Sequence, residues 1–240
     1  MDYLMPQNHP QNNADIMRKI PQITDLDMSE TEFIELLEYS MMPIQQFFSY
    51  YKCAIMEIET KFKVLDEQFS LNSETNPIEF IQSRIKSYGS IFRKCASKQI
   101  PYNLDQIERE VHDIAGIRVV CSFIQDIYRL ADCLLQQDDI TLIAKKDYIR
   151  NPKPNGYRSL HLIVAVPIFL ENEKRLVKVE VQLRTLAMDF WASLEHKLRY
   201  KKNLPENTLL SLAGDLKQCA DESAEWDMRM QAIRNEIAES

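Results

Sequence analysis

Apolar residues recur at spacings of three and four in two long stretches of the chain. The first stretch follows Pro43 and contains Ile44, Phe47, Phe48, Tyr51, Ile55, Ile58, Phe62 and Leu65. The second follows Pro205 and contains Leu209, Leu212, Leu216, Met230, Ile233 and Ile237. This spacing places side chains on one helix face, so each stretch is predicted to be a long helix with a buried stripe. A shorter helix is predicted before Pro43, starting at the capping-box pattern Ser29-x-x-Glu32.

Between these helices, short β-branched runs alternate with helical patterns. Strands are predicted over residues 117–123, 141–149, 159–166 and 176–184. Helices are predicted over residues 104–114, 124–137 and 185–200, and a further helix is expected to start at Asn76-Pro77-x-Glu79. The predicted fold is of the α+β class, with a mixed sheet of about five strands flanked by helices. We expect a loose arm over residues 1–28, one domain over residues 29–204 and a C-terminal helix over residues 205–240.

Composition restricts the function. The chain has 240 residues and a formal net charge of −7, which disfavours a stable nucleic-acid partner because such affinity depends on neutralising phosphates. Five cysteines without a CxxC pair argue against a disulfide framework or a zinc knuckle and suit a reducing cytoplasm. Neither a signal peptide nor a membrane-spanning run is recognised. We therefore expect a cytoplasmic protein that binds no membrane, with any anion site confined to a local patch.

The segment VKVEVQLR carries the clearest alternation in the chain. Its valines and leucine would face the core, while the opposite face presents Lys178, Glu180, Gln182 and Arg184. Taken alone, this pattern is typical of a half-exposed edge strand. If the segment pairs with the preceding strand, however, the same face also collects Tyr157 and His161. An aromatic ring, an amide and a carboxylate on one face can recognise a planar base.

The loop before that strand reads NPKPNGYRSLHL and contains one of only four glycines in the chain. Gly156 has no Cβ and could let the loop backbone approach a ligand. Lys153 adds a positive charge for a phosphate group. The loop is therefore interpreted as part of a nucleotide site.

A second candidate site is the basic run over residues 83–98, which contains no acidic residue. Its cations are Arg84, Lys86, Arg93, Lys94 and Lys98. The simpler interpretation is a solvated helix face. No G-x-x-x-x-G-K-[ST] motif is present, so a triphosphate would be held mainly by side chains. Asp113, just before the strand over residues 117–123, and Glu180, on another strand, could hold Mg²⁺, which prefers one or two carboxylates plus phosphate oxygens.

Four segments together resemble the synthetase domain of the RelA/SpoT superfamily. They are RIKSYGSI, HDIAGIRVVCSF, DYIRNPKPNGYRSLH and VEVQLRTLAMDFWASLEHKLRYK. The chain looks like a stand-alone small alarmone synthetase, closer to the RelP (YwaC) branch than to the RelQ (YjbM) branch. The resemblance implies a nucleotidyltransferase-like fold and a homotetramer formed through the terminal helices. It also implies Mg²⁺-dependent transfer of the β,γ-pyrophosphate of ATP to the ribose 3′-hydroxyl of GDP or GTP, with release of AMP.

The resemblance also implies a role for each site residue. The ATP-binding residues are Arg84, Lys86, Ser90, Lys94 and Arg118. The residues for GDP or GTP are Lys153, Asn155, Tyr157, His161 and Gln182, with Tyr157 stacked on guanine. Asp113 and Glu180 are the catalytic residues and the Mg²⁺ ligands, and Glu180 helps to ionise the 3′-hydroxyl.

Two alternatives stay open from the sequence. Related enzymes transfer pyrophosphate to tRNA or to adenine nucleotides, and the acidic net charge argues against tRNA. A catalytically inactive nucleotide sensor is the other alternative, and the presence of both carboxylates and both basic motifs argues against it.

Overall fold

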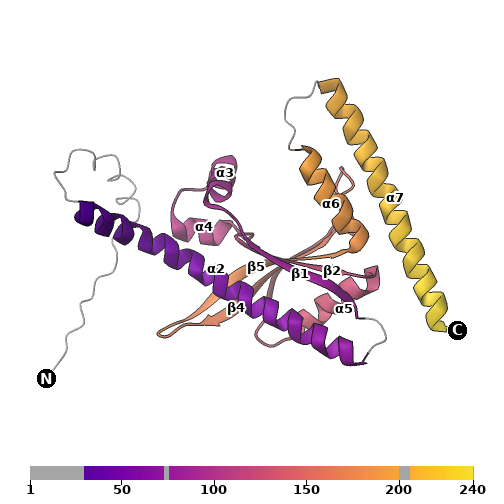
Figure 1. The fold of residues 1–240 in the computed structure, drawn as a ribbon, viewed down its shortest axis with the longest axis horizontal. Helices are drawn as coiled ribbons and strands as arrows, with labels where there is room; N and C mark the ends of the chain where they lie inside the picture. Colours follow the sequence, from indigo (N-terminus) through magenta and orange to yellow (C-terminus); the bar gives the residue numbers. More distant parts are fainter. Residues whose placement is uncertain (1–29, 73–75, 200–205, 240) are drawn as a thin grey trace. The chain divides into compact units, whose positions relative to one another are not determined.

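The structure, a computed structural model, describes residues 30–72, 76–199 and 206–239 (Figure 1). Contacts divide the chain into two compact units. One comprises residues up to Tyr50 together with Ser87–Val111, and the other comprises Tyr51–Lys86 together with His112–Ser240. The expected arm over residues 1–28, the cap at Ser29 and the boundary between residues 204 and 205 lie outside the described residues.

The fold is a mixed five-stranded sheet with helices before, between and after its strands, which confirms the predicted class. The helices are α2 (Glu30–Asn72), α3 (Tyr88–Lys98), α4 (Leu104–Glu110), α5 (Ile124–Leu135), α6 (Leu186–Arg199) and α7 (Glu206–Glu239). The strands are β1 (Ile78–Ile85), β2 (Ala115–Cys121), β3 (Thr141–Asp147), β4 (Leu160–Phe169) and β5 (Lys174–Thr185). They lie in the order β1-β2-β5-β4-β3. β2 and β5 are parallel, and the other neighbouring pairs are antiparallel.

The apolar residues that alternate along β5 face the core, as predicted. Val177, Val179, Val181 and Leu183 are all buried, at 1% exposure or less. The amphipathic helix α5 contacts β2 and β5, and its buried residues Ile127, Leu130, Ala131 and Leu134 follow the helical spacing. β5 lies between β2 and β4 rather than at the edge of the sheet, so the alternative of a half-exposed edge strand is wrong.

The predicted helix beginning at Asn76 is wrong, because this segment enters strand β1. The side-chain oxygen of Asn76 accepts a hydrogen bond from the backbone N–H of Ile78, at 3.0 Å. Residues from Ile78 onward pair with the buried strand β2, and this pairing overrides the local helix signal. The basic run is consequently divided between the end of β1 and the separate helix α3.

The predicted break at Pro43 is also wrong. Helix α2 continues through this proline over 43 residues. A proline inside a helix removes one backbone hydrogen bond, but the turns on either side of it can still form. The other predicted elements are confirmed, with ends that move by at most four residues. Within the described ranges, no helix is both long enough and apolar enough to cross a bilayer.

Candidate functional site

Strand register gathers the polar side chains of three strands on one face of the sheet. On β5, Glu180 lies opposite Gly116 of β2 and Ile163 of β4. Two residues further along, Gln182 lies between Arg118 of β2 and His161 of β4. Directly paired residues share a sheet face. The predicted pairing of the two strands is therefore confirmed, and β2 adds an arginine to the same face.

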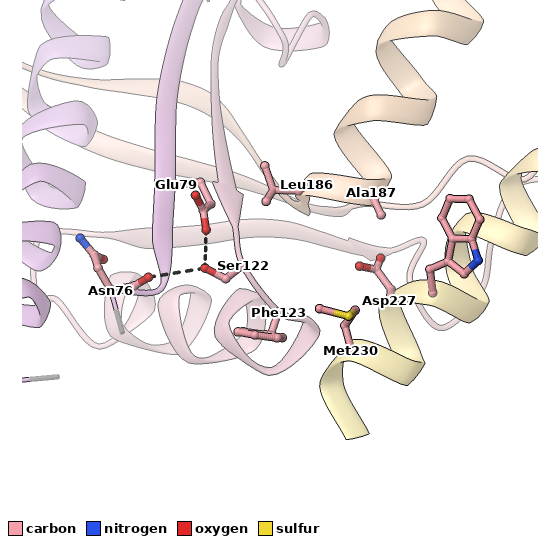
Figure 2. Close-up of a pocket in the computed structure, with 9 residues that line it drawn as sticks. Asn76, Glu79, Ser122, Phe123, Leu186, Ala187, Asp227 and Met230 are labelled. Carbon is pink, nitrogen blue, oxygen red and sulfur yellow. Dashed lines mark hydrogen bonds between the residues drawn. The ribbon is translucent and has the colours of Figure 1, made fainter. Parts of the chain in front are cut away.

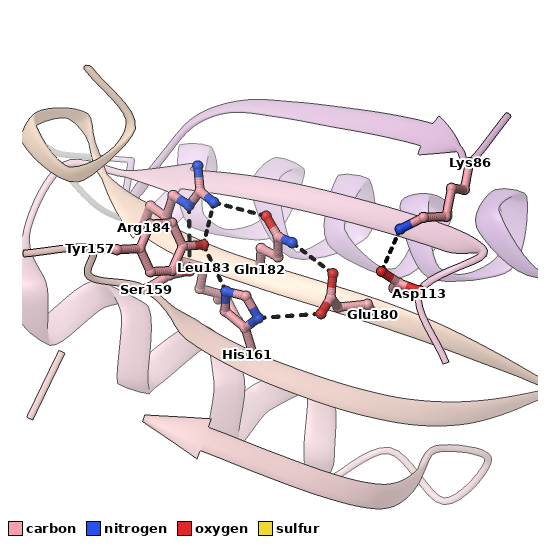
Figure 3. A network of polar contacts seen from close by, with 9 residues as sticks. All are labelled: Lys86, Asp113, Tyr157, Ser159, His161, Glu180, Gln182, Leu183 and Arg184. Atoms are coloured by element: carbon pink, nitrogen blue, oxygen red, sulfur yellow. Dashed lines mark hydrogen bonds and ion pairs between the residues drawn. The ribbon is translucent and has the colours of Figure 1, made fainter. Parts of the chain in front are cut away.

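Five side chains on this face form a closed ring of hydrogen bonds (Figure 3). The Tyr157 hydroxyl meets Nε2 of His161 at 2.8 Å, and Nδ1 of His161 meets Oε1 of Glu180 at 3.3 Å. The side-chain amide of Gln182 donates to the other oxygen of Glu180, at 2.7 Å. Nη2 of Arg184 closes the ring by donating to the Gln182 carbonyl, at 3.0 Å, and to the Tyr157 hydroxyl. The ring joins the predicted base-stacking tyrosine to the predicted catalytic carboxylate.

The carboxylate of Glu180 limits the hydrogen-bonding role of its neighbours. An ionised carboxylate can only accept, so its contact with Nδ1 of His161 requires a proton on that nitrogen. The Tyr157 hydroxyl accepts from Arg184 and can donate to Nε2 of His161 when that nitrogen is unprotonated. The histidine thus holds the carboxylate from one side while Gln182 holds it from the other.

Glu180 is ionised at neutral pH in this environment. Burial by itself raises the pKa of the carboxyl group, but the hydrogen bond and charge of His161 and the hydrogen bond from Gln182 oppose it. The net result is a pKa below the ordinary glutamate value, although the nearby charge of Asp113 acts in the opposite direction. The site therefore presents a carboxylate that can accept a proton.

A second acidic group lies beside Glu180 (Figure 3). Asp113 precedes β2, and its Oδ2 is 2.7 Å from Nζ of Lys86, which follows β1. Within the ranges that the structure describes, no cluster of three or more His, Cys, Asp or Glu side chains could hold a metal ion. Two neighbouring carboxylates nevertheless match the needs of an ion such as Mg²⁺, which takes its other ligands from water and phosphate.

Arginines form a positive cluster on the same face of the sheet. A single oxygen of Asp189 pairs with Nη1 of Arg118, at 3.1 Å, and with Nη1 of Arg184, at 3.2 Å. Burial lowers the pKa of Arg118, and the positive charges of Arg184 and Arg84 lower it further while Asp189 opposes the change. An anionic ligand would relieve this concentration of like charge.

The sequence interpretation missed two members of this arrangement, Arg184 and Asp189. Arg184 was expected only to occupy a polar position on its strand, yet its side chain is buried and makes four hydrogen bonds. The alternation of β5 placed this arginine on the correct face. It gave no indication of the partners outside β5, which come from a loop and from α6.

The loop before β4 brings Lys153 and Tyr157 together. Nζ of Lys153 lies 4.7 Å from the ring centroid of Tyr157 and 4.6 Å from that of Tyr148. Asn155 holds the loop in shape, because its carbonyl accepts from the backbone N–H of Tyr157 and its amide donates to Glu195 of α6. The three loop residues predicted to bind GDP or GTP therefore lie together, with Lys153 and Asn155 both contacting Tyr157 of the hydrogen-bonded ring.

The structure explains the glycine at position 156 by its backbone conformation and packing, whereas the sequence predicted an approach to a ligand. Its φ of 88° lies in the left-handed region, which L-residues with a side chain rarely adopt. It also packs directly against α7.

Ser90 and Lys94 belong to the other unit. They lie four residues apart on α3 and so share a helix face. Ser90 Oγ is hydrogen bonded to Ser87 Oγ, at 2.9 Å, and accepts from Arg93, at 3.1 Å. Their predicted role in ATP binding stays a prediction.

A cavity of about 470 Å³ lies elsewhere in the second unit (Figure 2). Apolar side chains such as Phe123, Leu186 and Met230 surround it, together with the carboxylates of Glu79 and Asp227. Among the described residues that line it, none is Lys or Arg. A polyphosphate would meet two negative charges and no compensating cation there, so this cavity is a poor nucleotide site.

Comparison with known proteins finds a family and several solved structures that resemble this chain. Residues 83–204 match the family described as the region found in RelA/SpoT proteins. The chain is 44% identical over 187 residues to GTP pyrophosphokinase YwaC of Bacillus subtilis, covering 78% of this chain and 88% of that protein. The crystal structure of B. subtilis small alarmone synthetase 1 bound to its product pppGpp matches with a TM-score of 0.74 and 36% identity, covering 81% of this chain and 98% of that one. The same synthetase bound to AMPCPP matches with a TM-score of 0.68 and 33% identity, covering 83% of this chain and 100% of that one.

Proposed function

Because this chain belongs to the RelA/SpoT family, we propose that it is a (p)ppGpp synthetase. It transfers the β,γ-pyrophosphate of ATP to the ribose 3′-hydroxyl of GDP or GTP and releases AMP. The observation that carries the proposal is the hydrogen-bonded ring around Glu180, which joins an ionised carboxylate to an aromatic ring suited to stacking on a base. The family comparison supports the same reaction, since relatives that cover most of the chain are named GTP pyrophosphokinase.

Glu180 acts as the general base in this proposal. The 3′-oxygen of the acceptor attacks the β-phosphorus of ATP as its proton passes to the Glu180 carboxylate, and the bond from that phosphorus to the oxygen bridging to the α-phosphate breaks. AMP leaves with that bridging oxygen. His161 and Gln182 hold both carboxylate oxygens by hydrogen bonds, so the base is oriented before the substrate arrives.

The acceptor nucleotide binds through the loop and strand β4. The guanine ring stacks on Tyr157, whose hydroxyl is fixed by Arg184 and His161. Base–aromatic stacking of this kind contributes about 1–3 kcal/mol. Lys153 supplies a charge for the acceptor phosphates, and Asn155 keeps the loop in shape.

The donor nucleotide binds through the basic residues. Arg84 and Arg118 stack on the adenine, as guanidinium planes readily do. Lys86, Ser90 and Lys94 contact the ATP phosphates in this proposal. Burial is the main cause of the lowered pKa of Arg118 and the positive charges of Arg184 and Arg84 add to it, so negative charge on the donor phosphates would favour the charged form of this arginine.

Mg²⁺ is the proposed cofactor, with Asp113 and Glu180 as its protein ligands. The ion would neutralise charge on the donor phosphates and on the leaving group. Two neighbouring carboxylates support this assignment, because Mg²⁺ takes its remaining ligands from phosphate and water. Lys86 keeps Asp113 in place by an ion pair at 2.7 Å.

We propose that the enzyme is a cytoplasmic homotetramer. Four apolar residues of α6 recur at every fourth position and are exposed, namely Leu186, Phe190, Leu194 and Leu198. On α7, Trp226, Met230, Ile233 and Ile237 are exposed as well. Apolar surface of this extent supports burial against further copies of the chain. The nucleotide substrates and the five free cysteines support a cytoplasmic location.

One incubation tests the proposed reaction. The purified protein is mixed with ATP, Mg²⁺ and, separately, GDP, GTP, excess ATP or uncharged tRNA, and the products are resolved by anion-exchange chromatography. We expect AMP together with ppGpp from GDP and pppGpp from GTP. Transfer to tRNA or to adenine nucleotides, with none to GDP or GTP, would replace the proposal with the corresponding alternative.

A further inference from the structure

The loop between β3 and β4, residues 148–159, is proposed to bind the acceptor nucleotide and is called the acceptor loop. Helix α7 lies directly against this loop at Gly156. A Cβ atom added to this glycine would overlap the Cβ of Ala220 and would lie 3.1 Å from Cδ of Lys217. Ala220 is 4% exposed, so the helix fills the space that a side chain at position 156 would need. The loop backbone can therefore reach its position only because it packs on α7 without a side chain between them.

The residue after this glycine packs on the same part of α7. Tyr157 contacts a small buried cluster formed by Trp191, Ala192 and Ala220. The indole N–H of Trp191 donates to the backbone carbonyl of Leu216, at 2.8 Å, which ties α6 to α7 beneath the tyrosine. The ring proposed to stack on guanine is thus supported from behind by the C-terminal helix.

A polar contact anchors α7 about two turns further on. Asp227 is 8% exposed and accepts a hydrogen bond from the hydroxyl of Thr185, at 2.6 Å, where β5 ends. Burial raises the pKa of Asp227, while the hydrogen bond from Thr185 and the charge of Arg158 lower it. Arg158 follows Tyr157 in the chain. The helix is therefore linked to the acceptor loop by the packing of Ala220 against Gly156 and by the electrostatic attraction between Asp227 and Arg158.

We infer that α7 is a positioning element of the acceptor site, and that Ala220 sets the place of Gly156 and Tyr157. This inference rests on the proposed function and adds a role for a helix expected only to mediate assembly. A bulkier side chain at position 220 pushes the loop away from the helix and moves the stacking ring. GDP and GTP then bind more weakly, while ATP binding, which uses residues on β1, β2 and α3, is preserved.

The direct test compares Ala220→Leu with the wild type by titration calorimetry. GDP and the non-hydrolysable ATP analogue AMPCPP are titrated separately into each protein. We expect the GDP dissociation constant to rise about tenfold, which corresponds to about 1.4 kcal/mol, with the AMPCPP constant changed by less than about twofold. Ala232→Leu, on an exposed position of the same helix, is the matched control and should leave both constants unchanged. Equal loss for both nucleotides, or loss for neither, would overturn the inference.

A double-mutant cycle keeps the inference testable if Ala220→Leu fails to fold. Gly156→Ala, Ala220→Gly and their combination are compared in GDP affinity. Gly156→Ala should weaken GDP binding, and Ala220→Gly should restore part of that loss by opening space for the added methyl group. Only part is recovered, since an alanine at a φ of 88° is strained whatever space it has. Strictly additive effects would mean that the two residues do not act through their contact.

The outcome for α7 is separable from the outcome for the proposed reaction. Wild-type turnover with ATP and GDP tests the reaction alone. If the wild type makes ppGpp and Ala220→Leu binds GDP as tightly as the wild type, only the role of α7 is wrong. If the wild type binds neither GDP nor GTP, the proposed function itself is wrong.

Discussion

Arg184 shows how a single buried side chain can hold a site together. It is 4% exposed and donates to a tyrosine, a glutamine, a serine and an aspartate. Only the guanidinium group offers enough donors in a fixed fork to serve these partners together. Its place on the polar face of β5 could be predicted from alternation. Its partners could not, because Tyr157 and Asp189 are brought to it by a loop and a helix.

Arg184→Lys should weaken the site while preserving its charge. A lysine ammonium reaches fewer of the four partners, and each buried group left unpaired costs about 1–3 kcal/mol. We expect a lower free energy of unfolding in urea and a higher KM for GDP, because Tyr157 loses the donor that fixes its hydroxyl. Arg229→Lys, on an exposed position of α7, serves as the control. An unchanged KM for GDP in a protein of reduced stability would mean that Arg184 acts only on folding.

The depressed pKa of Glu180 gives a pH dependence with a definite sign. A carboxyl group whose pKa is lower in the folded state stabilises the protein above its unfolded pKa of about 4.3. That contribution is lost as the pH falls through the lower folded pKa. Wild type and Glu180→Gln should therefore differ in urea stability more at pH 6 than at lower pH. A difference that grows as the pH falls would contradict the depressed pKa.

Among the elements, local sequence signals failed at two places. Asn76 and Pro77 matched the start of a helix, but the residues that follow complete the sheet as an edge strand beside β2. Pro43 matched a helix break, but α2 continues through it. By contrast, β5 and α5 could be predicted well, because each carries one strong period from end to end.

Pro43→Ala should stabilise the protein. An interior proline costs about 3 kcal/mol relative to alanine, so we expect the free energy of unfolding to rise by about 1–3 kcal/mol. The measurement is urea unfolding followed by circular dichroism, with the exposed neighbour variant Met42→Ala as the control. A loss of stability would mean that the proline ring makes a native contact that alanine lacks.

For the whole molecule, strand register explains how distant residues meet. β2 and β5 are parallel, so Arg118 and Gln182 become neighbours although 64 positions separate them in the chain. The sequence predicted that a mixed sheet exists, but not this strand order, which depends on packing among all five strands. The contact of Gly156 with Ala220 was beyond prediction for the same reason, since neither residue carries a local signal for the other.

Assembly can be tested at the apolar stripe of α6. Phe190 is 64% exposed and lies within the stripe that we propose to be covered by another copy of the chain. Phe190→Glu would bury a charge in that interface, so the assembly should dissociate while each chain stays folded. Size-exclusion chromatography with light scattering measures the mass, and Thr141→Glu, on an exposed position of β3, is the control. An unchanged assembly mass would show that this stripe is not an interface.

The most direct test of the account is the turnover of Glu180→Gln. The substitution keeps the shape of the side chain but removes its negative charge, its ability to take a proton and one hydrogen-bond acceptor, while the core face of β5 is untouched. Alarmone formation from ATP and GDP is followed by thin-layer chromatography across a Mg²⁺ series, with melting curves to verify folding and calorimetry to verify GDP binding. We predict a fall in kcat on the order of 10²–10⁴, with GDP binding largely retained and a cooperative melting transition that still lies above the assay temperature. A well-folded Glu180→Gln protein that makes alarmone at nearly the wild-type rate would contradict the assignment of Glu180 as the base.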